Sequence, residues 1–260
     1  MQTYNTQVEV TLRNCFFGKN MKDKTHLYHC TNYNAIYSIL TSGYFRPSYC
    51  LEEFSVFPDN HIKMAHAVVC FADLLSDEIQ KHMNTFHSDS YIRMTKEWAI
   101  KKRLAPVIYY PNNSYISVLL KSIIEFAMER SGGTTNKTVK FTNATNLLMG
   151  FLKQYKGKYW DKKKNTFSEE VLFYTEREWR YLPLPKNKEA YYISEENFYD
   201  KEFKEKKLKE LVDHGYILKF SWRDIEEIGV PISKKSELTN IISHLWQLKE
   251  KDVAEKIHPL

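Results

Sequence analysis

The sequence predicts an α+β fold, on three observations. Apolar residues make up 43% of the 260 residues and aromatic residues 15%, which is enough to build a buried core. Glycine and proline number only 8 each, so collagen-like and low-complexity chains are excluded. Stretches typical of short strands mix with stretches typical of helices without regular alternation, which favours α+β over a doubly wound sheet. We expect a single domain over residues 1–260.

The first half of the chain is expected to alternate irregularly between strands and helices. Residues 27–31 have the composition of a short strand, and Asn32 follows as a helix cap. Apolar residues then recur at helical spacing until Gly43, which ends the helix. The other elements expected here are strands over 67–71, 91–95 and 106–110 and helices over 74–83, 96–102 and 116–130.

The second half is expected to follow the same mixed pattern. A charged helix over 195–214 carries apolar residues at helical spacing and is stopped by Gly215. Residues 170–182 are strongly strand-like and end at prolines. The other elements expected here are helices over 144–154 and 236–248 and strands over 216–220 and 225–230.

Composition also excludes several classes of protein. The longest apolar runs, 67–70 and 116–120, are far shorter than the roughly 20 residues that span a bilayer. The polar start of the chain lacks the pattern of a secretory signal, so we expect a cytoplasmic protein. The four cysteines are widely spaced and the histidines have no metal-ligand spacing, so we expect free thiols and no metal site. A net charge of +6 is compatible with a polyanionic partner.

Two acidic residues and an arginine recur at every second position near the end of the 170–182 stretch. Because side chains alternate along a strand, Glu176, Glu178 and Arg180 are expected on one face. This arrangement has two interpretations. The first is a solvent-facing strand of mixed charge, and the second is a paired-carboxylate site in which Arg180 orients one glutamate.

A histidine and a threonine end the first expected strand. His29 and Thr31 are two residues apart, so their side chains are expected to point the same way. A lone histidine at a strand end is more often structural than catalytic. Its functional interpretation therefore depends on the residues that accompany it.

These residues resemble two known groups of proteins. Residues 29–31 (HCT) followed by 34–43 (NAIYSILTSG) resemble the opening of ADP-ribosyltransferase-fold proteins of the DarT and RNA 2′-phosphotransferase type, in which an H-x-T strand precedes a helix and a glycine. Four further motifs resemble, in order, the AbiGi-like abortive phage-resistance proteins: 70–73 (CFAD), 95–99 (TKEWA), 106–109 (PVIY) and 176–180 (EREWR).

The resemblance implies a fold and a site. It implies an ADP-ribosyltransferase-like core over 25–182, with a mixed or antiparallel β core and flanking helices, and a C-terminal α/β extension over 183–260 packed on that core. It also implies NAD as co-substrate, with Glu178 as the catalytic carboxylate that stabilises the developing oxocarbenium charge. The other implied site residues are His29 and Thr31 on the ribose, Arg46 on phosphate or acceptor, and Glu176 as the group that orients or activates the acceptor.

A basic loop precedes the glutamate stretch. It places two aromatic residues among several lysines: Lys158, Tyr159, Trp160, Lys162, Lys163 and Lys164. Such a loop suits phosphate attraction with base stacking, and it equally suits a solvated surface loop. The functional interpretation predicts nucleic acid as the acceptor.

The main functional hypothesis is an NAD-dependent ADP-ribosyltransferase that acts as a toxin-like effector in phage defence. The alternative is a non-catalytic antitoxin or binding module that pairs with a cognate toxin. A third hypothesis is a phosphotransferase that acts on RNA 2′-phosphate. The enzyme hypothesis predicts that the His29 ring and the Glu178 carboxylate face one concave pocket.

Overall fold

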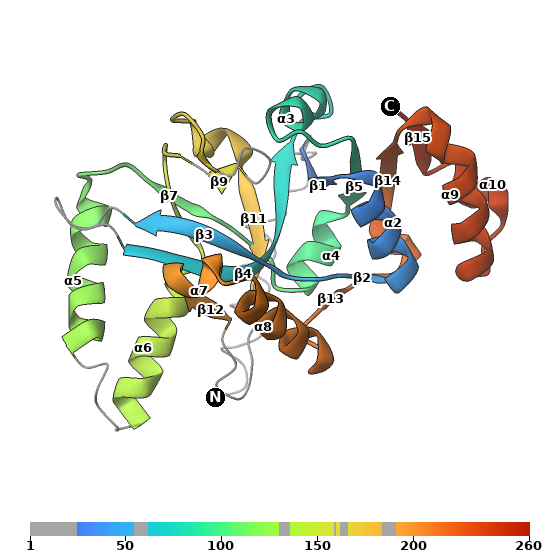
Figure 1. Cartoon of the computed structure of the whole chain (residues 1–260). Coiled ribbons are helices and arrows are strands. Elements are labelled where there is room, and N and C mark those ends of the chain that lie inside the picture. The colour runs from blue at the N-terminus through green and yellow to red at the C-terminus, as the bar shows by residue number, and fades with distance from the viewer. Residues whose placement is uncertain (1–24, 55–61, 130–135, 159, 162–165, 184–190) are drawn as a thin grey trace, which may run out of the picture.

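The computed structural model describes residues 25–54, 62–129, 136–158, 160–161, 166–183 and 191–260, and its fold is mixed α+β, as predicted (Figure 1). Its main sheet has nine strands: β1 (His26–Thr31), β3 (Ser48–Phe54), β4 (Ile62–Leu74), β5 (Ser90–Met94), β6 (Ala105–Pro106), β11 (Glu178–Tyr181), β12 (Tyr192–Ser194), β14 (Ile225–Val230) and β15 (Ile257–Pro259). The order is β15-β14-β5-β1-β4-β11-β6, and β3 and β12 also pair with β4. The ADP-ribosyltransferase-like topology stays a prediction.

Three pairs of short strands complete the β-structure: β2 (Tyr44–Phe45) with β13 (Leu218–Lys219), β7 (Ile108–Tyr110) with β8 (Leu152–Gln154), and β9 (Trp160–Asp161) with β10 (Thr166–Phe167). The α-helices are α2 (Tyr33–Ser42), α3 (Ile79–Thr85), α4 (Lys96–Lys101), α5 (Tyr115–Glu129), α6 (Asn136–Met149), α7 (Glu195–Tyr199), α8 (Lys201–Asp213), α9 (Ile232–Leu245) and α10 (Glu250–Ala254). Two short 3₁₀ helices are η1 (Phe173–Glu176) and η2 (Trp222–Asp224). Within the described ranges, no helix has both the length and the apolar character needed to cross a membrane.

The long strand β4 brings distant parts of the chain together. Its first half pairs with β3, from Phe54 opposite Ile62 to Ser48 opposite Val68. Its second half pairs with β1 on one side and β11 on the other, both antiparallel. The strands that carry His29 and Glu178 therefore belong to one antiparallel part of the sheet, which confirms that part of the prediction.

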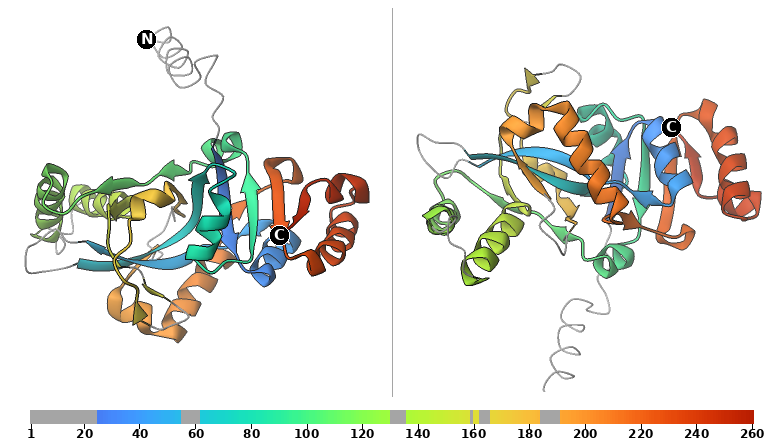
Figure 2. Two further views of the ribbon diagram at one scale, coloured as in Figure 1. Left: turned by 90° about the horizontal axis from the view of Figure 1, so that it is seen from above. Right: turned by 60° about the horizontal axis from the view of Figure 1, so that its bottom comes forward.

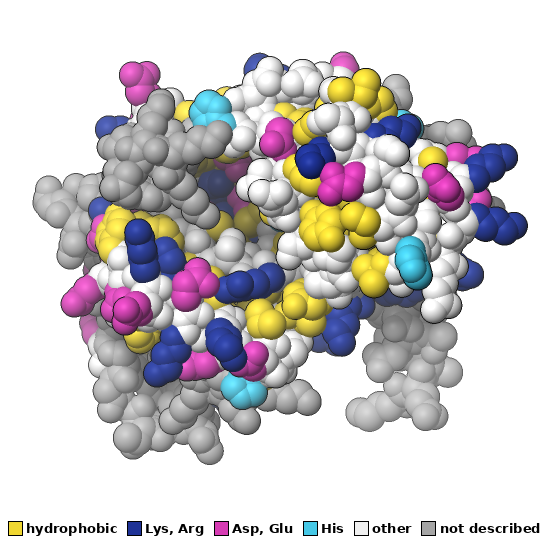
Figure 3. Space-filling view, turned by 45° about the vertical axis from the view of Figure 1, so that its right-hand side comes forward, with side chains coloured by type: hydrophobic (Ala, Val, Ile, Leu, Met, Phe, Trp, Pro, Cys, Tyr) yellow, Lys and Arg dark blue, Asp and Glu magenta, His cyan; other side chains and the backbone are white. Residues whose placement is uncertain are grey.

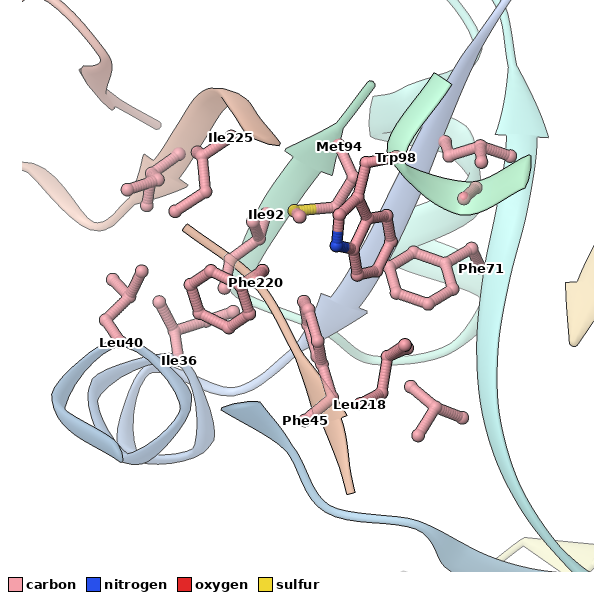
Figure 4. Packing of buried hydrophobic residues seen from close by; sticks show 14 of the residues in the cluster. Ile36, Leu40, Phe45, Phe71, Ile92, Met94, Trp98, Leu218, Phe220 and Ile225 are labelled. Atoms are coloured by element: carbon pink, nitrogen blue, oxygen red, sulfur yellow. The ribbon is translucent and has the colours of Figure 1, made fainter. Parts of the chain in front are cut away.

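The main apolar core lies on one face of this sheet. Figure 4 shows Trp98 of α4 close to Phe71 of β4, with Phe45 and Phe220 beside them. Leu40 of α2 joins the same cluster. The cluster also contains Leu238 and Ile242 of α9, so residues from both ends of the described chain close it. Aromatic residues this large and this buried contribute most of the packing energy of such a core.

The two ends of the molecule are formed by helices. Figure 2 shows α5 and α6 side by side at one end and α9 and α10 at the other. The sheet and its core lie between them. The C-terminal strands β14 and β15 add to the main sheet beside β5, so residues after 183 complete the sheet.

The stretch predicted as one strand over 170–182 is mostly not a strand. Residues Phe173–Glu176 form η1, and Arg177 follows with a φ of 44°, in the left-handed region. A left-handed residue interrupts an extended chain, so only Glu178–Tyr181 continues as β11. The Arg177 side chain holds this bend, because its Nε donates to Asp73 O at 2.6 Å and its guanidinium pairs with Glu78.

Two predicted helices have the wrong ends. The helix predicted over 144–154 stops at Met149, and Leu152–Gln154 is the strand β8. A Cβ at Gly150 would meet Leu182 Cδ2 at 2.2 Å, so a larger residue there would have to displace the Leu182 side chain. The helix predicted over 74–83 begins only at Ile79, because β4 extends to Leu74 and a turn follows.

Three more predicted elements differ in extent. The helix over 195–214 is divided at Asp200, whose side chain caps α8 by accepting from Phe203 N at 3.0 Å. The strand over 106–110 is divided into β6 and β7, which pair with different partners. The C-terminal helix begins at Ile232 rather than Ser236, and it follows Pro231 directly.

Candidate functional site

The main candidate site is a cavity of about 630 Å³ on the other face of the sheet from the aromatic core. Figure 3 shows a hollow in the surface with acidic and basic side chains inside it. The cavity is lined by residues of β1, β3, β4, β8, η1 and β11, by α3, and by the segment that follows α3. Its charged lining residues are Glu52, Asp89, Lys153, Glu176, Glu178 and Arg180. A volume of this size is typical of small-molecule sites.

Strand register places the Glu178 side chain on the cavity face. Glu178 lies opposite Ala72 of β4, and Ala72 lies opposite Tyr28 of β1. Directly opposed residues in an antiparallel pair project to the same face of the sheet. Tyr28, Ala72 and Glu178 therefore share one face, and all three line the cavity.

The same register turns His29 away from Glu178. His29 is the next residue after Tyr28, so its ring projects to the opposite face. There its centroid lies 5.1 Å from that of Phe45 and 5.4 Å from that of Phe71, and its Nδ1 donates to Cys70 O at 2.9 Å. Burial lowers the pKa of His29, which favours the neutral form of its ring. His29 contributes to the cavity wall, but the prediction that its ring faces Glu178 across one pocket is wrong.

The two other residues assigned to cofactor binding lie in different surroundings. Thr31 lines the cavity at the end of β1, two residues beyond His29. Arg46 is exposed and pairs with Glu205 at 2.9 Å in a separate cleft of about 390 Å³, beside Lys206 and Lys209. The structure thus does not bring Arg46 together with Glu178, and the ligand roles of Thr31 and Arg46 stay predictions.

The two glutamates lie close together and share contacts with Lys153, a residue that no sequence motif singles out. Lys153 Nζ lies 3.0 Å from Glu176 Oε2 and 3.1 Å from Glu178 Oε2, and it also lies 4.6 Å from the ring centroid of Phe173. Lys153 belongs to β8, in a segment predicted to be helical. The alternation argument for Glu176 and Glu178 was wrong in its premise, since Arg177 breaks the strand, but the two carboxylates are nevertheless neighbours.

Arg180 completes a buried ion-pair network. It is 1% exposed, and its Nε and Nη2 donate to the two oxygens of Glu178 at 2.7 and 3.0 Å. Its Nη1 donates to Gly150 O at 3.0 Å, and its Nη2 also pairs with Glu52. The network therefore joins β3, β8, η1 and β11 by charge-assisted hydrogen bonds.

The two glutamates of the network have opposite pKa shifts. Burial disfavours the charged form of Glu178, but the charges of Arg180 and Lys153 outweigh burial and hold its pKa below the usual range. Burial raises the pKa of Glu176, and Lys153 only partly offsets this effect. Both oxygens of Glu178 are occupied by cations, so its carboxylate acts first as an anchor for Arg180 and Lys153.

The predicted nucleic-acid loop lies largely outside the described residues. Tyr159, Lys162, Lys163 and Lys164 are not among them, and Trp160 is described only as part of β9. Lys158 is exposed next to the bridge between Gly157 and Val171. Nucleic-acid binding by this loop stays a prediction.

Three cysteines that form no disulfide among the described residues also line the cavity: Cys30, Cys50 and Cys70. Burial raises the pKa of Cys30 to about 12, which keeps its thiol protonated at neutral pH. In the part of the chain that the structure describes, no group of three or more histidine, cysteine or acidic side chains is placed to hold a metal ion.

Comparison with known proteins gives one match. The model of the family described as "Putative abortive phage resistance protein AbiGi, antitoxin" matches residues 44–231. This range spans 188 of the 260 residues (231 − 44 + 1), well over half of the chain, and it includes β3, β4, β8 and β11. No curated protein and no solved structure matches the chain.

Proposed function

The chain belongs to the AbiGi family of abortive phage resistance proteins, and from that premise we propose that it is an antitoxin that neutralises a cognate toxin. The observation that carries the proposal is the family match over 44–231. This range includes four of the five cavity-lining strands and the whole ion-pair network. The proposal therefore applies to the folded body of the protein rather than to one end of it.

The main functional hypothesis from the sequence, a toxin-like NAD-dependent ADP-ribosyltransferase, is wrong. The family that matches is described as an antitoxin, which agrees with the alternative instead. The resemblance to AbiGi-like proteins is confirmed, whereas the resemblance to ADP-ribosyltransferases has no match behind it. The use of NAD and a nucleic-acid acceptor stay predictions that rest on that second resemblance alone.

The arrangement around Glu178 suits a binding protein. Its carboxylate is held by Arg180 of the same strand and by Lys153 of β8. Arg180 also pairs with Glu52 of β3, so the network joins three strands. A rigid scaffold of this kind limits the entropy lost when a partner docks. Binding a protein partner needs no exposed carboxylate at Glu178.

An exposed apolar surface supports a protein partner. On α5, Tyr115 is 95% exposed and Val118 and Leu119 are each 60% exposed. Phe126 and Phe141 extend this surface onto α6, with ring centroids 5.0 Å apart. We call these five residues the α5–α6 surface. Contiguous exposed apolar residues on a folded protein are typical of protein–protein contacts, so we assign the toxin contact to this surface.

Co-expression tests the antitoxin role. Candidate toxins come from the genes adjacent to the one that encodes this chain, and each is induced alone and together with the chain. We expect one of them to stop growth alone and the chain to restore colony counts. Leu119→Asp places a charge in the apolar contact, so it is expected to weaken toxin binding by at least about tenfold and to reduce the rescue.

Ile232→Asp is the matched control, because Ile232 is 74% exposed and begins α9, the helix at the opposite end of the molecule from α5 (Figure 2). It is expected to leave the rescue unchanged. If no toxic neighbour is rescued by the parent chain, the antitoxin proposal is wrong. If Leu119→Asp and Ile232→Asp rescue equally, only the assignment to the α5–α6 surface is wrong.

A further inference from the structure

The cavity has an excess of negative charge that its own residues do not balance. Its lining contains the carboxylates of Glu52, Glu176, Glu178 and Asp89, against the cations Lys153 and Arg180. Four carboxylates and two cations leave two negative charges when all are ionised. His82 adds no positive charge, because burial lowers its pKa to about 4. The chain as a whole carries +6, so this excess is local to the cavity.

Both cations, Arg180 and Lys153, already form hydrogen bonds and ion pairs with other groups of the protein. Arg180 is 1% exposed, and all three of its guanidinium nitrogens bond to Glu178, Glu52 or Gly150 O. Lys153 bonds to Glu176 and Glu178. Neither cation is free to receive an anionic ligand without breaking a buried ion pair, which is costly.

One carboxylate oxygen at the cavity remains open. Glu176 Oε2 accepts from Lys153, whereas Glu176 Oε1 accepts no hydrogen bond from any of the described residues. The Glu176 side chain keeps 14% exposure and that of Glu52 keeps 13%, so both reach the cavity. A hydrogen-bond donor with positive charge is the group that satisfies such an oxygen best.

The part of the cavity best suited to an anion, beside the N-terminus of α2, is already occupied by the carboxylate of Asp89. The N-terminus of α2 lies at the cavity, because its cap residue Asn32 lines the cavity, and a helix N-terminus favours negative charge. Asp89 Oδ1 already accepts from Tyr33 N at 2.8 Å, and Asn32 Oδ1 accepts from Ala35 N at 2.9 Å. A phosphate-bearing ligand would have to displace Asp89.

The size and lining of the cavity favour a small organic cation over a metal ion. No described group of side chains is placed to hold a metal ion, and about 630 Å³ is far more than one ion needs. Tyr28 and Phe86 form an aromatic part of the cavity wall. We propose that this cavity binds a small organic cation with an ammonium or guanidinium group, held by Glu176 and Glu52 over an aromatic wall. The proposal does not depend on the antitoxin role.

The proposal predicts how binding depends on pH. Glu176 is faced by Lys153 of β8, Glu178 of β11, Glu52 of β3 and Tyr109 of β7. Burial raises the pKa of Glu176, and a cation binds only the ionised form well. Affinity should therefore rise as pH increases through that raised pKa, and binding should release a proton.

The test is a calorimetric titration of the purified full chain with agmatine, which carries both a guanidinium and an ammonium group. We expect saturable binding of one agmatine per chain, tighter at pH 8 than at pH 5. The matched probe is 4-guanidinobutyrate, in which a carboxylate replaces the terminal aminomethyl group of agmatine. It is expected to bind at least about tenfold more weakly, and NAD is expected to bind more weakly than agmatine.

Variants locate the site. Glu176→Gln keeps the shape of the side chain and removes its charge, so it should weaken agmatine binding at least about tenfold and flatten the pH dependence. Glu170→Gln is the matched control, because Glu170 is exposed and paired with Lys156 outside the cavity, and it should bind like the parent. Amide chemical shifts of the parent should change on binding at residues 28–32 and 82–89.

Three outcomes would overturn the proposal. The first is no saturable agmatine binding by the parent at any pH from 5 to 8. The second is tighter binding of NAD or 4-guanidinobutyrate than of agmatine. The third is chemical-shift changes confined to residues outside the cavity. A failed growth rescue with normal agmatine binding would reject the antitoxin role and leave this inference intact.

Discussion

Replacing Arg180 by methionine is expected to lower the free energy of unfolding by about 3–5 kcal/mol, the usual cost of removing one partner from a buried ion pair. The change leaves the carboxylates of Glu178 and Glu52 without their cation and leaves Gly150 O without its donor. Methionine fills similar volume, so the loss reports charge and hydrogen bonding rather than a void. Urea unfolding followed by tryptophan fluorescence measures it.

The control is Arg223→Met, because Arg223 is exposed and belongs to none of the ion pairs of the network. Its unfolding midpoint should match that of the parent. The double variant Glu178→Gln with Arg180→Met should recover part of the loss, since it removes one of the uncompensated charges. A loss for Arg180→Met no greater than that for Arg223→Met would show that the network does not stabilise the fold.

Replacing Trp98 by alanine is expected to cost about 3–5 kcal/mol, as for other large core aromatics. Trp98 is 2% exposed, its ring centroid lies 5.6 Å from that of Phe71 and 6.0 Å from that of Phe45, and its Nε1 donates to Lys219 O at 3.3 Å. The truncation leaves a cavity at the centre of the main core and an unpaired carbonyl. Thermal and urea unfolding both measure the loss.

Ile100→Ala is the control for Trp98→Ala. Ile100 lies two residues further along α4 and is 51% exposed, so its truncation should change stability little. Similar losses for both variants would mean that α4 does not pack through Trp98. Trp98 is the tryptophan of the 95–99 motif, so this motif is accounted for by the Thr95 cap, which accepts from Trp98 N at 3.2 Å, and by core packing.

Elements fixed by local signals were predictable from the sequence. Helix α2 begins after Asn32, whose side chain accepts from Ala35 N, and ends at Gly43, which has a φ of 74°. The prediction of 33–42 as a helix used these same two signals. Strand β14 was predicted over its observed range, 225–230, from its short apolar run.

The candidate site could not be predicted from local sequence patterns, because it depends on contacts between distant segments of the chain. Lys153 and Glu52 join Glu178 only because β8, β3 and β11 meet in three dimensions. The left-handed Arg177 is set by its long-range bonds to Asp73 and Glu78. The alternation of side chains along β1 shows which neighbours of His29 share its face. Only the register of β1 and β11 with β4 shows that His29 and Glu178 project to opposite faces of the sheet.

Deletion of the gene for this chain tests the antitoxin role most directly. The measurement is the number of viable deletion strains recovered when the partner toxin gene is intact and when it is also deleted. An antitoxin is needed only while its toxin is made, so we expect recovery in the double deletion and little or none in the single deletion. Equal recovery from both backgrounds would contradict the proposal that this chain neutralises a toxin.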